Sequence, residues 1–228
     1  MLYVPILYSL TSLTYPPYRL EIFAPHRHQC GLEINLSRLR DSLTQPLPDQ
    51  PHSSLMNAIY LWACFVSRPE PLCQHEDHFL GQALEALRDG LRDGDKIVDV
   101  IRASCLLALY FFANGRFFEG SYHSSAAAAL AVQCGLHSPI QEDASWLVDA
   151  NEPFDLKPPK SGYREGERIL AFWQVYNLDR CWSVATRKPS VIPDGPEAIS
   201  CPWPQNIDEY EQASPANLFS SPRCLTFF

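Results

Sequence analysis

FWQVYNLDRCWSVATRKPSVIPD, residues 172–194, is the stretch that decides the fold class of this chain. It continues an apolar pattern with the i, i+3, i+4, i+7 spacing of one face of a helix. The four residues of that pattern are Ile169, Phe172, Trp173 and Tyr176. The spacing predicts a long helix over about residues 166–187, ended by the basic residues and prolines that follow it.

Asp179 and Arg180 lie next along the edge of this helix, where a charged pair needs an explanation. An isolated charge in an apolar interior is costly, so the pair must be hydrogen-bonded or ion-paired. Arg168 and Arg187, near the two ends of the helix, are candidate partners for Asp179. Two interpretations stay open. We favour a buried polar network that fixes the packing of the helix over a polar point in a ligand cavity.

Nearly proline-free stretches elsewhere in the chain show the same helical spacing of apolar residues. They predict helices over residues 52–68, 75–94, 95–115 and 121–137, the last two joined into a hairpin by the segment NGRFFEG. The segments RLEIF and LEINL look extended, but both are short. The fold class is therefore all-α.

Prolines divide the chain between these predicted helices. They cluster at residues 46–51, 153–159 and 189–204, and the polar stretch 138–166 is typical of a loop. The expected architecture is an irregular multi-helix bundle with antiparallel helical hairpins and long Pro-rich loops.

The composition bounds the function classes. Hydrophobic residues make up 46% of the 228 residues and charged residues 19%, which is typical of a globular protein. The formal net charge is −8, without a clustered run of Lys and Arg, so the chain is a poor candidate to hold nucleic acid by itself. No stretch reaches the length of uncharged apolar residues that a membrane span needs.

Eight cysteines are spread along the chain, and no two form a C-x-x-C pair. Several lie inside apolar helical patterns, where cysteine acts as a small hydrophobic residue. We therefore expect free thiols of an intracellular protein rather than a disulfide framework.

Two histidine clusters are weak metal candidates. His75 and His78 in HEDHF are three apart rather than the four of a zinc-protease helix, and the acidic residues between them suit a helix N-terminus. In HRHQC, an extended strand would place His26, His28 and Cys30 on one face, but no partner cluster accompanies them. We expect no metal ligand in this chain.

Signals for catalysis are equally weak. The chain lacks a G-x-S-x-G nucleophile motif and a glycine loop that could hold phosphate. An enzyme would need titratable groups that converge in one cleft. The set to check is His75, His78, His123 and Asp179. We expect no enzyme.

RILAFWQVYNLDRCWSVATRKPSVIPD resembles the signature of the fungal-specific transcription factor domain, the middle homology region of zinc-cluster regulators. The matching elements that we take as its structural signature are Arg168, Phe172, Trp173, Asp179, Arg180 and Pro189. AIYLWAC and IRASCLLALYFFANGRFFEGSYHSSAAAALAVQCGLH also look like this domain. One departure is that Arg187 and Lys188 precede Pro189, where the family has Gly-Arg.

The resemblance implies a regulatory module of a fungal RNA polymerase II transcription factor, resident in the nucleus, that modulates transcription and senses a small molecule. It implies co-regulators or a second copy of the chain as further partners. Zinc and DNA would be bound by a zinc-cluster segment whose cysteine pairs do not occur in these residues, so we expect no cofactor and no direct DNA binding here. The alternative is a helical protein-interaction scaffold without ligand sensing or DNA binding. An apolar cavity between the 101–113 and 168–184 helices would favour sensing, whereas a packed core with an exposed groove would favour a scaffold.

The same reading divides the chain into three parts. We expect an uncertain N-terminal segment over residues 1–20, an incomplete regulatory domain over 21–200 and an irregular C-terminal tail over 201–228.

Overall fold

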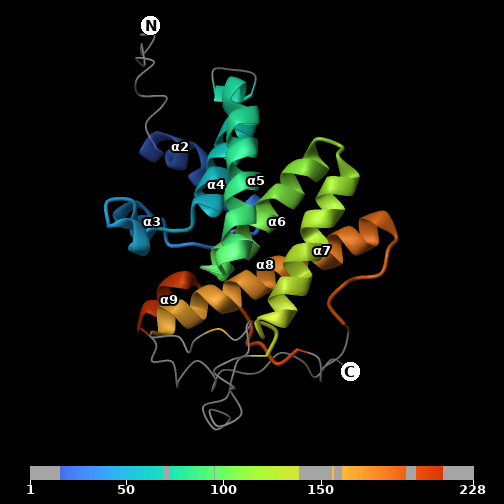
Figure 1. Ribbon diagram of the computed structural model, residues 1–228. Coiled ribbons are helices and arrows are strands. Elements are labelled where there is room, and N and C mark those ends of the chain that lie inside the picture. Colours follow the sequence, from blue (N-terminus) through green and yellow to red (C-terminus); the bar gives the residue numbers. More distant parts are fainter. Residues whose placement is uncertain are drawn as a thin grey trace, which may run out of the picture.

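The computed structural model describes residues 16–68, 72–94, 96–138, 156, 161–193 and 199–212. Helices dominate these residues, and the all-α fold is confirmed (Figure 1). The α-helices are α2 (Pro16–Phe23), α3 (Leu36–Ser42), α4 (Ser53–Val66), α5 (Glu76–Asp93), α6 (Ile97–Ala113), α7 (Phe117–Gln133), α8 (Gly162–Thr186) and α9 (Ile207–Gln212). Short 3₁₀ helices are η1 (Ala24–Cys30), η2 (Leu47–Asp49) and η3 (Leu72–His75).

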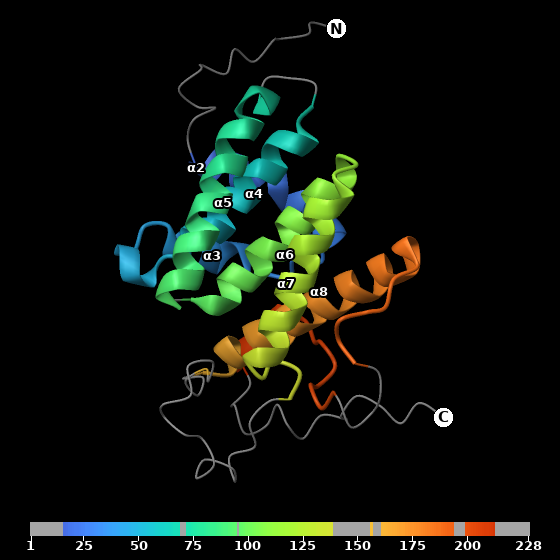
Figure 2. The same cartoon turned by 45° about the vertical axis from the view of Figure 1, so that its right-hand side comes forward.

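Two antiparallel hairpins form the upper part of the molecule. Helix α4 pairs with α5, and α6 pairs with α7. Helix α8 packs across the α6/α7 hairpin, with α7 crossing it in both views, and carries α9 beside its N-terminal half (Figures 1 and 2). The long predicted helix thus packs on one of the two hairpins, through α6 and α7.

Helix α6 lies at the centre because it is apolar on nearly all sides. Its Ala103 and Leu107 pack into one core with α2, α4 and α5. Its Ile101, Cys105 and Phe112 pack into a second core with α7 and α8. The space between α6 and α8 is therefore filled by packed side chains such as Ile101 and Phe172, both fully buried.

Close approach between helices depends on small residues. A Cβ added at Gly166 of α8 would lie 2.3 Å from Cγ of Tyr210, the buried residue of α9. Ala127, Ala128 and Ala131 of α7 are buried in the second core in the same manner. Their short side chains let the backbone of α7 come near α6, as the alanine-rich sequence indicates.

The structure corrects three local predictions. Helix α8 begins at Gly162 rather than about residue 166, because the Ser161 side chain accepts a hydrogen bond from the Arg164 N–H and caps it. Helix α7 begins at Phe117 rather than residue 121. RLEIF lies in α2 and is not extended, because Leu20 and Phe23 are three apart and are buried together on one side of a helix.

The proline-rich stretches are only partly described. Residues 153–159 lie outside the described residues, apart from Leu156, and so does most of 138–166. Within the expected irregular tail, residues 207–212 form α9, because Tyr210 finds a buried place against Gly166. The division of the chain into segments stays a prediction. Among the helices in the described ranges, none is long and apolar enough to span a membrane.

Candidate functional site

The carboxylate of Asp179 joins α8 to the segment that follows it. Asp179 is 6% exposed. Its oxygens accept hydrogen bonds from the backbone N–H of Val191 at 3.0 and 3.1 Å and from that of Ile192 at 3.0 Å. The partners of Asp179 are thus backbone amides rather than Arg168 or Arg187, the partners that the sequence suggested.

Arg180 holds the same segment from its neighbouring position. Its Nη1 donates to the Ser190 hydroxyl at 2.5 Å, and its Nη2 donates to the backbone carbonyl of Ile192 at 2.8 Å. The guanidinium also lies 4.8 Å from the centre of the Tyr176 ring. We call residues 188–193 the return segment. Asp179 accepts hydrogen bonds from N–H groups of the return segment, and Arg180 donates hydrogen bonds to its carbonyls. The charged pair therefore fixes the direction in which the chain leaves α8.

The other signature residues have structural surroundings. Phe172 is fully buried in the second core. The Trp173 indole donates to the Pro202 carbonyl at 2.6 Å and stacks on Trp203 at 4.7 Å. Arg168 lies 4.0 Å from the carboxylate of Glu165, one turn earlier in α8, and Pro189 is exposed in the return segment.

Arg187 ends α8 in a left-handed conformation, with φ 55° and ψ 40°. The N–H groups of Arg187 and Lys188 donate back to the carbonyls of Val184 and Ser183. Glycine suits this backbone best because it has no Cβ to clash. The family's glycine position is thus a helix end that this chain forms with an arginine.

The histidines do not assemble a reaction centre with Asp179. His75 and His78 lie at the start of α5, and His123 stacks on the Phe111 ring at 5.3 Å. Burial lowers the pKa of His123. Asp179 is engaged by the return segment instead.

The second histidine cluster is not extended. His26, His28 and Cys30 lie in the 3₁₀ helix η1, so alternate residues do not share a face. His28 contacts Glu33, and burial raises the pKa of the Cys30 thiol to about 12. In the described ranges, no group of three His, Cys, Asp or Glu side chains is arranged to hold a metal ion.

The described cysteines are free thiols, as predicted. Cys105 is fully buried, and burial raises the pKa of its thiol to about 12. Cys224 lies outside the described residues.

A cleft of about 940 Å³ opens between α3, the start of α6 and the start of α8. We call it the polar cleft. Its charged lining side chains near the two helix starts are Lys96, Asp99, Arg102, Arg164 and Glu167. Apolar side chains such as Ile34, Leu39 and Leu55 line another part of it. The cleft therefore offers both charged and apolar contacts to a bound molecule.

Two carboxylates of the polar cleft, both near the helix starts, are already engaged, and Asp41 of α3 and Asp49 of η2 also line the cleft. Glu167 accepts from Nη1 of Arg164 at 2.9 Å. Asp99 accepts from the backbone N–H of His52 at 2.9 Å, and burial raises the pKa of its carboxyl group.

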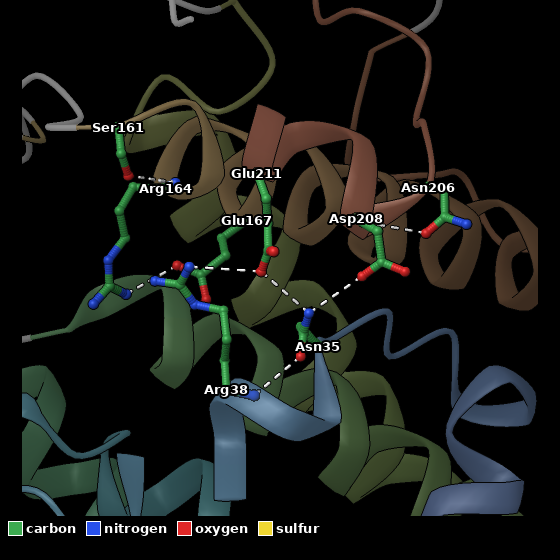
Figure 3. A network of polar contacts seen from close by, with 8 residues as sticks. All are labelled: Asn35, Arg38, Ser161, Arg164, Glu167, Asn206, Asp208 and Glu211. Carbon is green, nitrogen blue, oxygen red and sulfur yellow. Dashed lines mark hydrogen bonds and ion pairs between the residues drawn. The ribbon is translucent and has the colours of Figure 1, made fainter. Parts of the chain in front are cut away.

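A polar network ties the rim of the cleft to α9 (Figure 3). Asn35 caps α3 through the Arg38 N–H, and its amide donates to Asp208 and Glu211, both at 3.2 Å. Arg38 lies 3.5 Å from Glu211, and its guanidinium covers the Tyr163 ring at 3.9 Å. These contacts fix α3 against α8 and α9, and thereby shape the cleft.

Sequence reasoning did not find the polar cleft. Its charged residues near the helix starts come from two separate segments, 96–102 and 164–167, and no spacing rule links them. The signal that could have pointed to it is Arg102, the one arginine inside the apolar stretch DKIVDVIRASCLLALYFFANG. An apolar cavity between α6 and α8 would have favoured sensing, but side chains of the second core fill this space.

Comparison with known proteins returns one family. A family model described as the fungal specific transcription factor domain matches residues 27–226. The search of curated proteins gives no match. The search of solved structures gives none either.

Proposed function

Since the chain belongs to the fungal specific transcription factor domain family, whose members are regulatory regions of fungal transcription factors, we propose that it tunes such a regulator in response to a small molecule. The regulator acts in the nucleus on transcription by RNA polymerase II. The effector binds in the polar cleft. Co-regulators or a second copy of the chain receive the resulting signal.

The polar cleft is the observation that carries the sensing part of this proposal. Its volume of about 940 Å³ lies within the range of small-molecule sites in proteins. It also lies where α3, α6 and α8 meet, so a bound molecule would contact three helices that belong to both cores. A molecule bound in the cleft can therefore alter how the two cores pack against each other.

DNA contact and metal binding belong to other segments in this proposal. The net charge of −8 opposes binding to the phosphate backbone. Zinc is held by a DNA-binding segment of the regulator outside this chain, and this chain binds no cofactor. In this proposal the chain is a regulatory module and not an enzyme, and Asp179 and Arg180 hold the return segment rather than a substrate.

The experiment joins the full chain to a heterologous DNA-binding domain and an activation segment in a fungal reporter strain. We expect reporter activity to change at least threefold relative to the same fusion without the chain. Equal activity at equal protein level would contradict a regulatory role. A mobility-shift assay on the full chain should show no sequence-specific DNA binding at physiological salt, and specific nanomolar binding would contradict the proposed division of labour.

A second candidate function is a protein-interaction scaffold, favoured by exposed aromatic side chains. Phe118 is 96% exposed and Tyr122 69% exposed, both on α7. Next to them, Phe112 contacts Phe117 and stacks on Trp182 of α8 at 3.6 Å. In the reporter, a scaffold loses its effect when Phe118 and Tyr122 are replaced by serine. A sensor that acts through the polar cleft keeps its effect.

A further inference from the structure

Arg102 is a buried cation that forms no close ion pair within the described ranges, although the Asp99 carboxyl group, one turn earlier in α6, lies near enough to act on its charge. Its side chain lines the polar cleft, and the residue is 2% exposed. Nη2 donates to the carbonyls of Glu167 at 3.0 Å and Glu33 at 3.5 Å. Nε is buried without a hydrogen-bond partner, and Nη1 makes no hydrogen bond to a described residue. A buried charge in this state is costly unless something pairs with it.

The surroundings of Arg102 favour an anion. Helices α6 and α8 begin at the cleft, and each presents the positive end of its dipole there. Lys96 gives its Nζ protons to the carbonyls of Gln50 and Leu47 rather than to a described carboxylate. Asp99 and Glu167 have donors of their own, as described above. Asp41 of α3 and Asp49 of η2 also line the cleft. Near the two helix starts, Arg102 and Lys96 nevertheless donate hydrogen bonds to backbone carbonyls and not to a described carboxylate.

We propose that the polar cleft binds a small amphipathic carboxylate, whose oxygen accepts a hydrogen bond from Nη1 of Arg102. Its apolar part lies against Ile34, Leu39 and Leu55, which line the same cleft. A guanidinium donates charge-assisted hydrogen bonds that are stronger than neutral ones, and this strength gives the site its preference for carboxylates. The inference rests on the proposed sensing function and names the chemical class of the effector.

Octanoate and octanamide are matched probes for this site, because they share an apolar chain and differ in charge. Titration of each into the full chain, followed by calorimetry or ligand-observed NMR at fixed ionic strength, measures the dissociation constants. We expect saturable octanoate binding and at least tenfold weaker binding of octanamide. Equal affinities, or no octanoate binding up to 10 mM, a ceiling of about 2.7 kcal/mol at 25 °C, would overturn the proposal.

Substitutions locate the site. Arg102→Gln should weaken octanoate binding at least tenfold, whereas Arg187→Gln, an exposed arginine at the far end of α8, should leave it unchanged. An unchanged dissociation constant in folded Arg102→Gln would contradict the assignment. If that variant does not fold, Lys96→Gln takes its place. We expect it to bind octanoate at least threefold more weakly. An unchanged dissociation constant would contradict the proposed site.

Inorganic phosphate separates an amphipathic carboxylate from any small anion. We expect phosphate not to displace octanoate at equal concentration, and displacement would overturn the amphipathic class. The result of the binding experiments does not depend on whether the chain regulates transcription. Octanoate binding without a reporter effect contradicts only the proposed function, and a reporter effect without octanoate binding contradicts only this inference.

Discussion

The carboxylate of Asp179 in α8 accepts a hydrogen bond from the backbone N–H of Ile192 at 3.0 Å, and the Ile192 side chain is buried in the second core. One acidic side chain thus determines both the exit of the helix and the placement of an apolar residue 13 positions later. This relationship explains why a charged pair follows an apolar stripe. It assigns Asp179 and Arg180 to the architecture of the domain.

Asp179→Asn should lower the free energy of unfolding by about 1–3 kcal/mol, because the amide nitrogen cannot accept from the two N–H groups that face the side chain. Urea or thermal unfolding measures the loss. Asp41→Asn is the control, since Asp41 is exposed, and it should change stability by less than about 0.5 kcal/mol. A loss this small in Asp179→Asn would rule out the proposed role of the carboxylate.

Arg187→Gly should stabilise the chain by about 0.5–1 kcal/mol, because the left-handed backbone at φ 55° strains a residue with a Cβ. Arg187→Ala removes the same side chain but keeps the Cβ, so it should bring little of this gain. Thermal unfolding of the two variants tests the difference. Equal melting temperatures for glycine and alanine would show that the backbone is not strained there.

Gly166→Ala should destabilise the chain by about 1–3 kcal/mol, since the new methyl group would lie 2.3 Å from Cγ of Tyr210. Gly81→Ala is a matched control in α5, where the added Cβ would meet no atom within 4 Å apart from the backbone of its own helix. In an exposed helix interior that change should stabilise by up to about 1 kcal/mol. If Gly166→Ala is as stable as the wild type, α9 does not pack on α8 as described.

Acidification should weaken the fold through His123. Burial lowers the pKa of His123 in the folded state below its ordinary value of 6.5. The unfolded chain therefore binds the proton more readily, and stability falls as the pH drops through and below 6.5. We expect His123→Gln to lose less stability between pH 7 and pH 5 than the wild type. If the wild type and His123→Gln lost the same amount of stability between pH 7 and pH 5, this role of His123 would be contradicted.

The sequence predicts the helices well because their apolar spacing is local information. It places Asp179 at a buried position for the same reason. It does not predict the partners of Asp179. These are the backbone N–H groups of Val191 and Ile192, and every residue except proline has such a group, so the residue types do not show which ones bind. The start of α8 was missed because Ser161, its cap, lies in a polar stretch that is typical of a loop.

The polar cleft depends on tertiary structure and could not be predicted from local patterns. Arg102 is surrounded by apolar residues along the chain, but it reaches the carbonyls of Glu33 and Glu167 only after α6 and α8 have packed. The cap residue Asn35 likewise meets Asp208 and Glu211 from a segment more than 170 positions away. Contacts of this kind follow from the fold.

The reporter fusion with substitutions in the polar cleft tests the central claim most directly. Arg102→Gln should change the effect of the chain on reporter activity at least threefold at equal protein level, whereas Phe118→Ser with Tyr122→Ser should leave it unchanged. That result would place regulation in the cleft. A reporter that responds to the serine substitutions and ignores Arg102→Gln would contradict the account and support a scaffold.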